Sequence, residues 1–154
     1  MRRLSWFLAL SPPRKRLLFH ALIALPLCYA ALTVTGFRRL QAILSGFHTI
    51  DIRGAPARSR ADFDRIQSTM WAVRAAANHG LVRGQCLQQS LTLWWLLQRQ
   101  NLEGEIRFGA RRRDDKLEAH AWVEVGGAVL PLGAEESPSF VPFAQARVPI
   151  DVGR

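Results

Sequence analysis

Apolar residues dominate the first third of the chain. The run from Leu17 to Phe37 contains no Asp, Glu, Lys or Arg, and its length is close to the roughly 20 residues that cross a bilayer. Polar residues and a proline within the run, and basic residues at both ends, favour a buried or interfacial helix. A transmembrane helix and, less favoured, a secretory signal stay open as alternatives. Residues 37–47 repeat apolar positions at helical spacing and predict a short amphipathic helix.

A second helix is predicted after a loop at residues 51–60, where glycine and proline stand among charged residues. Ser59 and Asp62 have the spacing of a capping box, which favours a helix start at this point. The sequence Asn78-His79-Gly80 predicts its end. Apolar residues at helical spacing indicate its inner face: Phe63, Ile66, Met70, Val73 and Ala77.

The most apolar helix is predicted after Gly84, in the sequence CLQQSLTLWWLLQ. Leucine and tryptophan surround most of its circumference, which indicates a helix in the middle of the core. Cys86 stands in its first turn, where unpaired N–H groups and the positive end of the helix dipole favour a thiolate. The same N–H groups can stabilise an oxyanion on a carbonyl that the sulfur attacks. A cysteine that simply packs as a small apolar residue is the alternative.

The last third predicts strands. EIRFGA, residues 105–110, alternates apolar and polar positions as a half-buried strand does, and RRRDDK, residues 111–116, predicts a charged loop. A strand from Leu117 to Val125, the turn Gly126-Gly127 and a returning strand from Ala128 predict a hairpin. His120 lies in the middle strand, between two alanines.

These elements predict one compact α+β domain. N-terminal helices and a central buried helix that begins at the cysteine precede an antiparallel sheet of about three or more strands. We expect residues 1–50 to form an apolar helical segment that packs on a core of residues 59–154. A length of 154 residues suits one such domain.

Composition excludes several classes of protein. A hydrophobic content of 49% argues against disorder. Two cysteines without a CxxC pair or a Cys/His cluster give poor support to a disulfide scaffold or a zinc site, so no metal or other cofactor is expected. The net charge of +9 indicates an acidic partner or surface. Nucleic-acid binding is not expected, since no base-reading motif accompanies the charge.

The order of the elements indicates a thiol enzyme. A helix that begins at a cysteine, followed by an antiparallel meander with a histidine in its middle strand, is the order of papain-like and transglutaminase-like cores. The sequences GQCLQQSLTLWWLLQ and, above all, AHAWVEVGG resemble the leader peptidase of lasso-peptide biosynthesis. That family is the stand-alone second half of a split B protein and has a transglutaminase-like fold. The opening LSPPRKRLLFHALIALPLCYAAL…GFRRL is similar to the family's LSxxxRLLxxxALxxL…FRRL, which argues against a transmembrane segment.

The resemblance implies a cysteine peptidase with Cys86 as the nucleophile and His120 as the general base. It would remove the leader of a lasso precursor peptide, so that a partner synthetase closes a macrolactam on the new amino terminus. The first third has no run of strands that would recognise a leader, so we expect a separate leader-recognition protein. The expected location is the cytoplasm, with contact at a membrane surface left open. The arginines at positions 111–113 are candidates for holding an acidic leader or that partner, and a solvated loop is the alternative.

The third catalytic member is the point of departure from the family. The family pattern places an aspartate about twelve residues after the histidine, where this chain has Leu132. Glu124 shares a strand face with His120, but four residues along a strand span roughly 13 Å, too far for a hydrogen bond. A two-residue hairpin places Glu135 diagonal to His120, within reach of a long side chain. We therefore predict Glu135 as the residue that orients the imidazole, with Glu136 or a backbone carbonyl as alternatives.

Two other functions compete with leader removal. A transglutaminase-like acyltransferase would use the same Cys86 and His120 and transfer the acyl group to an amine. A membrane-inserted protein of another function would use the run from Leu17 to Phe37 as its span.

Overall fold

The structure is a computed structural model of the chain, and it describes residues 11–36, 39, 59–80, 85–113, 116–132 and 141–142. The predicted α+β class is confirmed. The described elements are α2 (Pro12–Thr35), α4 (Arg60–His79), α5 (Cys86–Gln98), β1 (Glu105–Arg113), β2 (Lys116–Val125), β3 (Ala128–Leu130) and β4 (Val141–Pro142). Of the predicted helix at residues 37–47 the structure describes only Arg39, which is helical, and most of the predicted loop before Arg60 lies outside the described residues.

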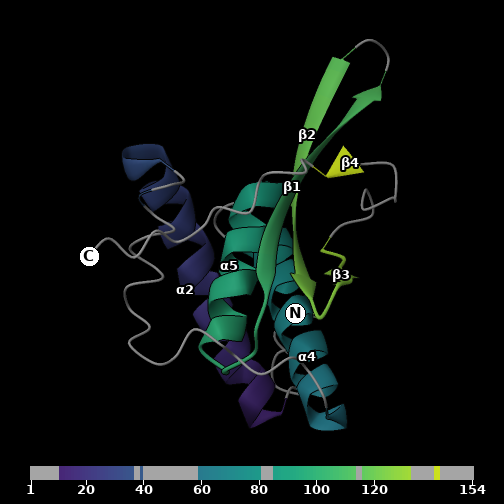
Figure 1. Ribbon diagram of the computed structural model, residues 1–154. Helices are drawn as coiled ribbons and strands as arrows, with labels where there is room; N and C mark the ends of the chain where they lie inside the picture. Colours follow the sequence, from purple (N-terminus) through teal and green to yellow (C-terminus); the bar gives the residue numbers. More distant parts are fainter. Residues whose placement is uncertain are drawn as a thin grey trace, which may run out of the picture.

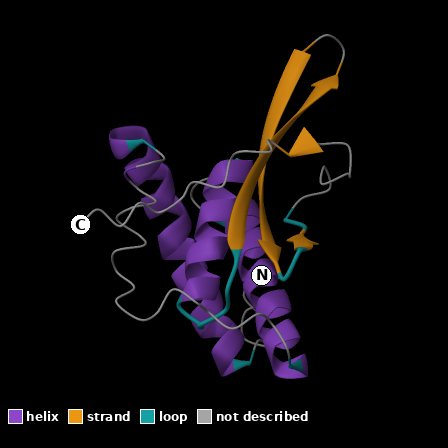
Figure 2. Cartoon of the chain, in the orientation of Figure 1, coloured by secondary structure: helices purple, strands orange, loops and turns teal. Residues whose placement is uncertain are grey.

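The helices form one layer beside an antiparallel sheet of order β3-β2-β1-β4, as Figures 1 and 2 show. α5 lies at the centre, because it contacts α2 and α4 on one side and β2 and β1 on the other. The outer half of the β1–β2 hairpin extends beyond the helices (Figure 1). The hydrophobic core therefore lies between the helices and the inner half of the sheet, with α5 in its middle.

α2 buries one of its sides and exposes the other. It begins with two prolines, which suit a position where the backbone N–H has no helical partner. It ends at Gly36, whose φ of 76° is favoured by glycine. Within the described part of the chain, α2 is the one helix that is long and apolar enough to cross a membrane, by length and composition. The buried residues are Leu18, Ala21, Ala24, Leu25 and Cys28.

The predicted start of α4 is confirmed. The Ser59 hydroxyl accepts a hydrogen bond from the Asp62 N–H at 3.1 Å, and the Asp62 carboxylate accepts one from the Ser59 N–H at 3.1 Å. The prediction that Phe63 lies on the buried face is wrong, because its side chain is 57% exposed. Phe63 shares the face of Ile66 and Met70, but it lies in the first turn, before α4 reaches the core.

The sheet is longer than its sequence predicts. The prediction of a loop at residues 111–116 is wrong for residues 111–113 and 116, since β1 extends to Arg113 and β2 begins at Lys116, while residues 114–115 lie outside the described residues. Opposite charges explain the extension, because Arg111 lies across from Glu118 and its Nε donates to that carboxylate at 2.6 Å.

The predicted hairpin turn between β2 and β3 is confirmed. Gly126 and Gly127 have φ values of 59° and 82°, the left-handed conformation that a two-residue turn requires. Val125 pairs with Ala128, and the pairing continues to Val123 opposite Leu130.

Candidate active site

Cys86 is the first residue of α5, at the point where this helix emerges from the core. Gln85 precedes it in an extended conformation without capping the helix by its side chain. Cys86 is partly exposed, whereas the helix is largely buried from Ser90 to Leu97. The thiol therefore combines access from solvent with the N–H groups of a helix start, the environment in which reactive thiols occur.

A buried hydrogen bond ties the beginning of α5 to the middle of β2. The Ser90 hydroxyl donates to the carbonyl oxygen of Ala121 at 2.8 Å. Ser90 lies one helical turn after Cys86, so the two share a helix face. Ala121 directly follows His120. The pairing of β2 with β3 ends at Val123, so β3 does not reach Ala121. A side chain of α5 therefore provides the hydrogen-bond partner of the Ala121 carbonyl.

His120 lies in β2 opposite Gly109 of β1. The imidazole stacks against the indole of Trp122, with ring centroids 6.2 Å apart and planes at 18° (aromatic pairs contact at such separations). The Nε2 atom is buried although the residue as a whole is partly exposed.

Trp122 is itself held by a chain of polar contacts that sequence reasoning missed. Its Nε1 donates to one oxygen of the Glu124 carboxylate at 2.8 Å, and the other oxygen accepts from Arg107 Nε at 3.2 Å. Arg107 also forms an ion pair with Glu105 at 3.1 Å. The alternation of His, Trp and Glu in HAWVE was the available signal, because it places all three on one face of a strand. The contacts fix the ring on which His120 stacks and assign Glu124 to other partners than the imidazole.

The residues considered for the third catalytic position have different outcomes. The side chain of Leu132 is 8% exposed and packs in the hydrophobic core, and its carbonyl accepts a hydrogen bond from Arg74 Nε at 3.2 Å. Glu135 and Glu136 lie outside the described residues, beyond the end of β3 at Leu130. The role of Glu135 stays a prediction, while the core position of Leu132 accounts for an apolar residue there.

The predicted arginine surface beside the hairpin is partly used within the fold. Arg111 is bound to Glu118, and Arg112 is exposed, whereas the side chain of Arg113 lies outside the described residues. Within the described ranges, no group of His, Cys, Asp and Glu has an arrangement that would hold a metal ion.

Replacing Ser90 by alanine is expected to destabilise the protein by about 1–3 kcal/mol. The change leaves the buried Ala121 carbonyl without its hydrogen bond, and burying an unsatisfied polar group costs about this much. Urea denaturation measures the difference. Ser68→Ala on α4 is the matched control, and we expect it to change stability by less than ~0.5 kcal/mol. Equal stability of the two variants would contradict a structural role for the Ser90 bond.

Comparison with known proteins places the sequence in a wider group. A family model described as the transglutaminase-like superfamily matches residues 31–145, a span that includes both Cys86 and His120. No curated protein and no solved structure matches the chain significantly.

Proposed function

The chain belongs to the transglutaminase-like superfamily, and from this premise we propose that it is a cysteine peptidase that removes the leader from a lasso precursor peptide. Cys86 is the nucleophile and His120 the general base of this proposal. The superfamily includes cysteine proteases and acyltransferases. Of these two activities, we propose hydrolysis for this chain.

The observation that carries the proposal is the hydrogen bond between Ser90 and Ala121. It holds the helix turn that follows Cys86 against the strand residue that follows His120. The stacking of His120 on an anchored Trp122 limits the rotation of the imidazole. Both features support a thiol and an imidazole held on rigid elements, as nucleophilic catalysis requires.

The proposed reaction has two steps. His120 takes the Cys86 proton as the thiolate attacks the scissile carbonyl, and the imidazolium gives that proton to the departing amine of the core peptide. The leader then remains bound to Cys86 as a thioester. In the second step His120 takes a proton from water, the hydroxide attacks the thioester, and the departing thiolate of Cys86 receives that proton back from His120. The N–H groups at the start of α5 are the donors proposed to stabilise the oxyanion in both steps.

Two further proteins belong to the proposal. A separate leader-recognition protein delivers the precursor, and a synthetase uses the released amino terminus to close the macrolactam. The net charge of +9 supports an acidic peptide or an acidic partner surface as the contact.

The products of the reaction separate hydrolysis from acyl transfer. We incubate the purified protein with the cognate precursor and the leader-recognition protein, with and without excess methylamine. The masses of the products are then measured by mass spectrometry. We expect a leader with a free carboxyl terminus and a core peptide with a free amino terminus under both conditions. A leader that carries methylamine as its main form would identify an acyltransferase. An intact precursor beside an active recognition protein would contradict the proposal.

A further inference from the structure

The outward side of α2 is an exposed apolar surface whose exposure the packing of the fold does not explain. We define the apolar stripe as Phe19, Ile23, Leu27 and Val34, whose exposed fractions are 60%, 44%, 62% and 83%. No charged residue occurs in α2 after Arg16. A helix that is apolar on all sides normally lies inside a protein or a membrane, and contiguous exposed apolar residues mark a contact surface. The opposite side of α2 is packed into the core.

The stripe leads directly into a basic end of the same helix. At 100° per residue, Arg16 and His20 lie on the same side of α2 as Ile23 and Leu27. Arg16 and His20 also line a cavity of about 560 Å³ at the beginning of α2. Apolar and basic groups therefore follow one another along a single helix face.

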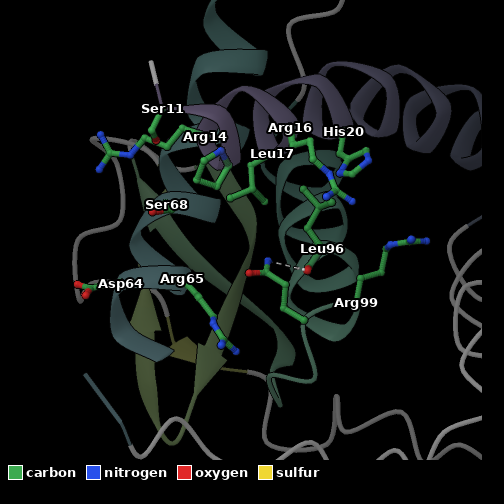
Figure 3. Close-up of a pocket in the computed structure, with 12 residues that line it drawn as sticks. Ser11, Arg14, Arg16, Leu17, His20, Asp64, Arg65, Ser68, Leu96 and Arg99 are labelled. Carbon is green, nitrogen blue, oxygen red and sulfur yellow. Dashed lines mark hydrogen bonds between the residues drawn. The ribbon is translucent and has the colours of Figure 1, made fainter. Parts of the chain in front are cut away.

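The cavity concentrates positive charge over an apolar floor. Figure 3 shows side chains from three helices around it, with Leu17 and Leu96 between the basic groups. Among the residues that line it, Asp64 is the one carboxylate. The lining arginines are Arg14, Arg16, Arg65 and Arg99.

Two of these arginines are held at the rim by aromatic rings. The guanidinium of Arg14 lies 5.8 Å from the centre of the Trp71 ring, and that of Arg99 lies 5.2 Å from the Trp95 ring. Such contacts limit the freedom of the side chain while its N–H groups stay available. Guanidinium groups in this setting suit the planar, two-point binding of phosphate.

We propose that α2 docks the protein on the surface of an anionic phospholipid bilayer. The arginines of the cavity bind the phosphates of the headgroups, and the apolar stripe enters the boundary with the acyl chains. A dissolved anion would use the arginines and leave the stripe exposed, whereas a neutral apolar partner would use only the stripe. An anionic bilayer satisfies both, as it does for interfacial helices with one basic and one apolar part.

The arginine cavity of this contact lies away from the candidate active site. Leu96 and Arg99 stand at the end of α5, and Cys86 stands at its beginning. A helix of 13 residues is about 20 Å long, so the cavity and the thiol lie at opposite ends of it. The leader-peptidase proposal is not needed for this inference, because it rests on α2 and the cavity alone.

Flotation of the full-length protein with vesicles tests the proposal without any peptide substrate. We compare vesicles of phosphatidylcholine that contain about one third phosphatidylglycerol with vesicles of phosphatidylcholine alone. Binding to the anionic vesicles is expected, with at least a tenfold weaker partition to the neutral ones and release at ~1 M salt, which screens the charges. Binding to neither kind, or to both equally, would overturn the proposal.

Paired variants separate the cavity from the general charge of the protein. Arg16→Gln with Arg65→Gln is expected to weaken binding about 25-fold, since each basic residue near an anionic surface contributes about fivefold. The control pair, Arg112→Gln with Lys116→Gln, removes the same charge from the hairpin, and we expect less than about a twofold change. An equal loss in both pairs would show that net charge alone binds lipid and would overturn the site.

A third variant tests the stripe. Ile23→Ser with Leu27→Ser removes two exposed apolar side chains, and binding is expected to fall at least tenfold (burying one such side chain is worth about this much). Circular dichroism and thermal melting confirm that each variant keeps its fold. Full binding by this variant would mean that the stripe stays outside the bilayer, against the proposal.

Discussion

Cys86→Ala is expected to lower the turnover number for leader release by roughly 10⁴-fold or more, because the variant lacks the thiol that forms the proposed acyl-enzyme. The side chain lies at the start of α5 and is not fully buried, so its removal should leave the fold intact. Quantitative mass spectrometry of the released leader, at saturating precursor and recognition protein, measures the effect. Release at the wild-type rate by this variant would refute the central claim of the proposed function.

The chain contains its own matched control in Cys28. This second free cysteine lies in the core side of α2, and burial raises the pKa of its thiol, while the nearby Thr92 hydroxyl lowers it to a smaller extent. Cys28→Ala is expected to keep full leader release. At neutral pH, iodoacetamide should modify Cys86 and leave Cys28 unmodified in the folded protein, as a buried thiol is inert. Loss of activity on alkylation of Cys28 alone would contradict the assignment of Cys86 as the nucleophile.

The same experiment tests His120→Ala. General-base catalysis contributes about 10²–10⁴-fold to the rate of a reaction. The expected fall in turnover is of that size. The double variant with Cys86→Ala should be no slower than Cys86→Ala alone, since residues that act as one unit are not additive. A further loss in the double variant would mean that His120 acts independently of the thiol.

Local sequence signals determined the fold where a few neighbouring residues suffice. Ser59 and Asp62 satisfy each other's backbone, so the start of α4 could be predicted from their spacing alone. The Gly126-Gly127 turn likewise determines the register of β3. The exposure of Phe63 could not be predicted in this way, because it depends on where α4 meets its neighbours. The extension of the hairpin depends on Arg111 meeting Glu118 on the other strand.

In the candidate site, too, local features could be predicted from the sequence and contacts between distant segments could not. A cysteine at a helix start and a histidine in a strand are visible in the sequence. Ser90, which joins the two elements, looks like one more polar residue of an apolar helix until its partner on β2 is known. The polar contacts of Trp122 also link residues on different strands, Glu124 and Arg107. Contacts between distant segments leave little short-range signal, and this is why the sequence pointed to the candidate residues Cys86 and His120 but not to the contacts that hold their elements.

Leu132→Asp is expected to destabilise the protein by at least about 4 kcal/mol and to give no gain in activity. The leader-peptidase family that the sequence resembles has an aspartate near this position, so the substitution recreates that pattern. In this chain the side chain is 8% exposed and packs in the core. The variant loses the burial of a leucine, worth about 2–3 kcal/mol, and places a carboxylate in an apolar setting at a further cost of several kcal/mol.

Denaturation in urea and the rate of leader release together decide this prediction. Leu132→Met is the matched control, and it should cost less than about 1.5 kcal/mol because the volume and apolar character are kept. A loss of about 4 kcal/mol is a large part of the 5–15 kcal/mol that stabilises a typical domain, so Leu132→Asp should also express poorly. A stable Leu132→Asp protein with faster leader release would show that position 132 can reach the imidazole. The expected result instead requires that the group that orients His120 come from another part of the chain, for which Glu135 is the first residue to replace.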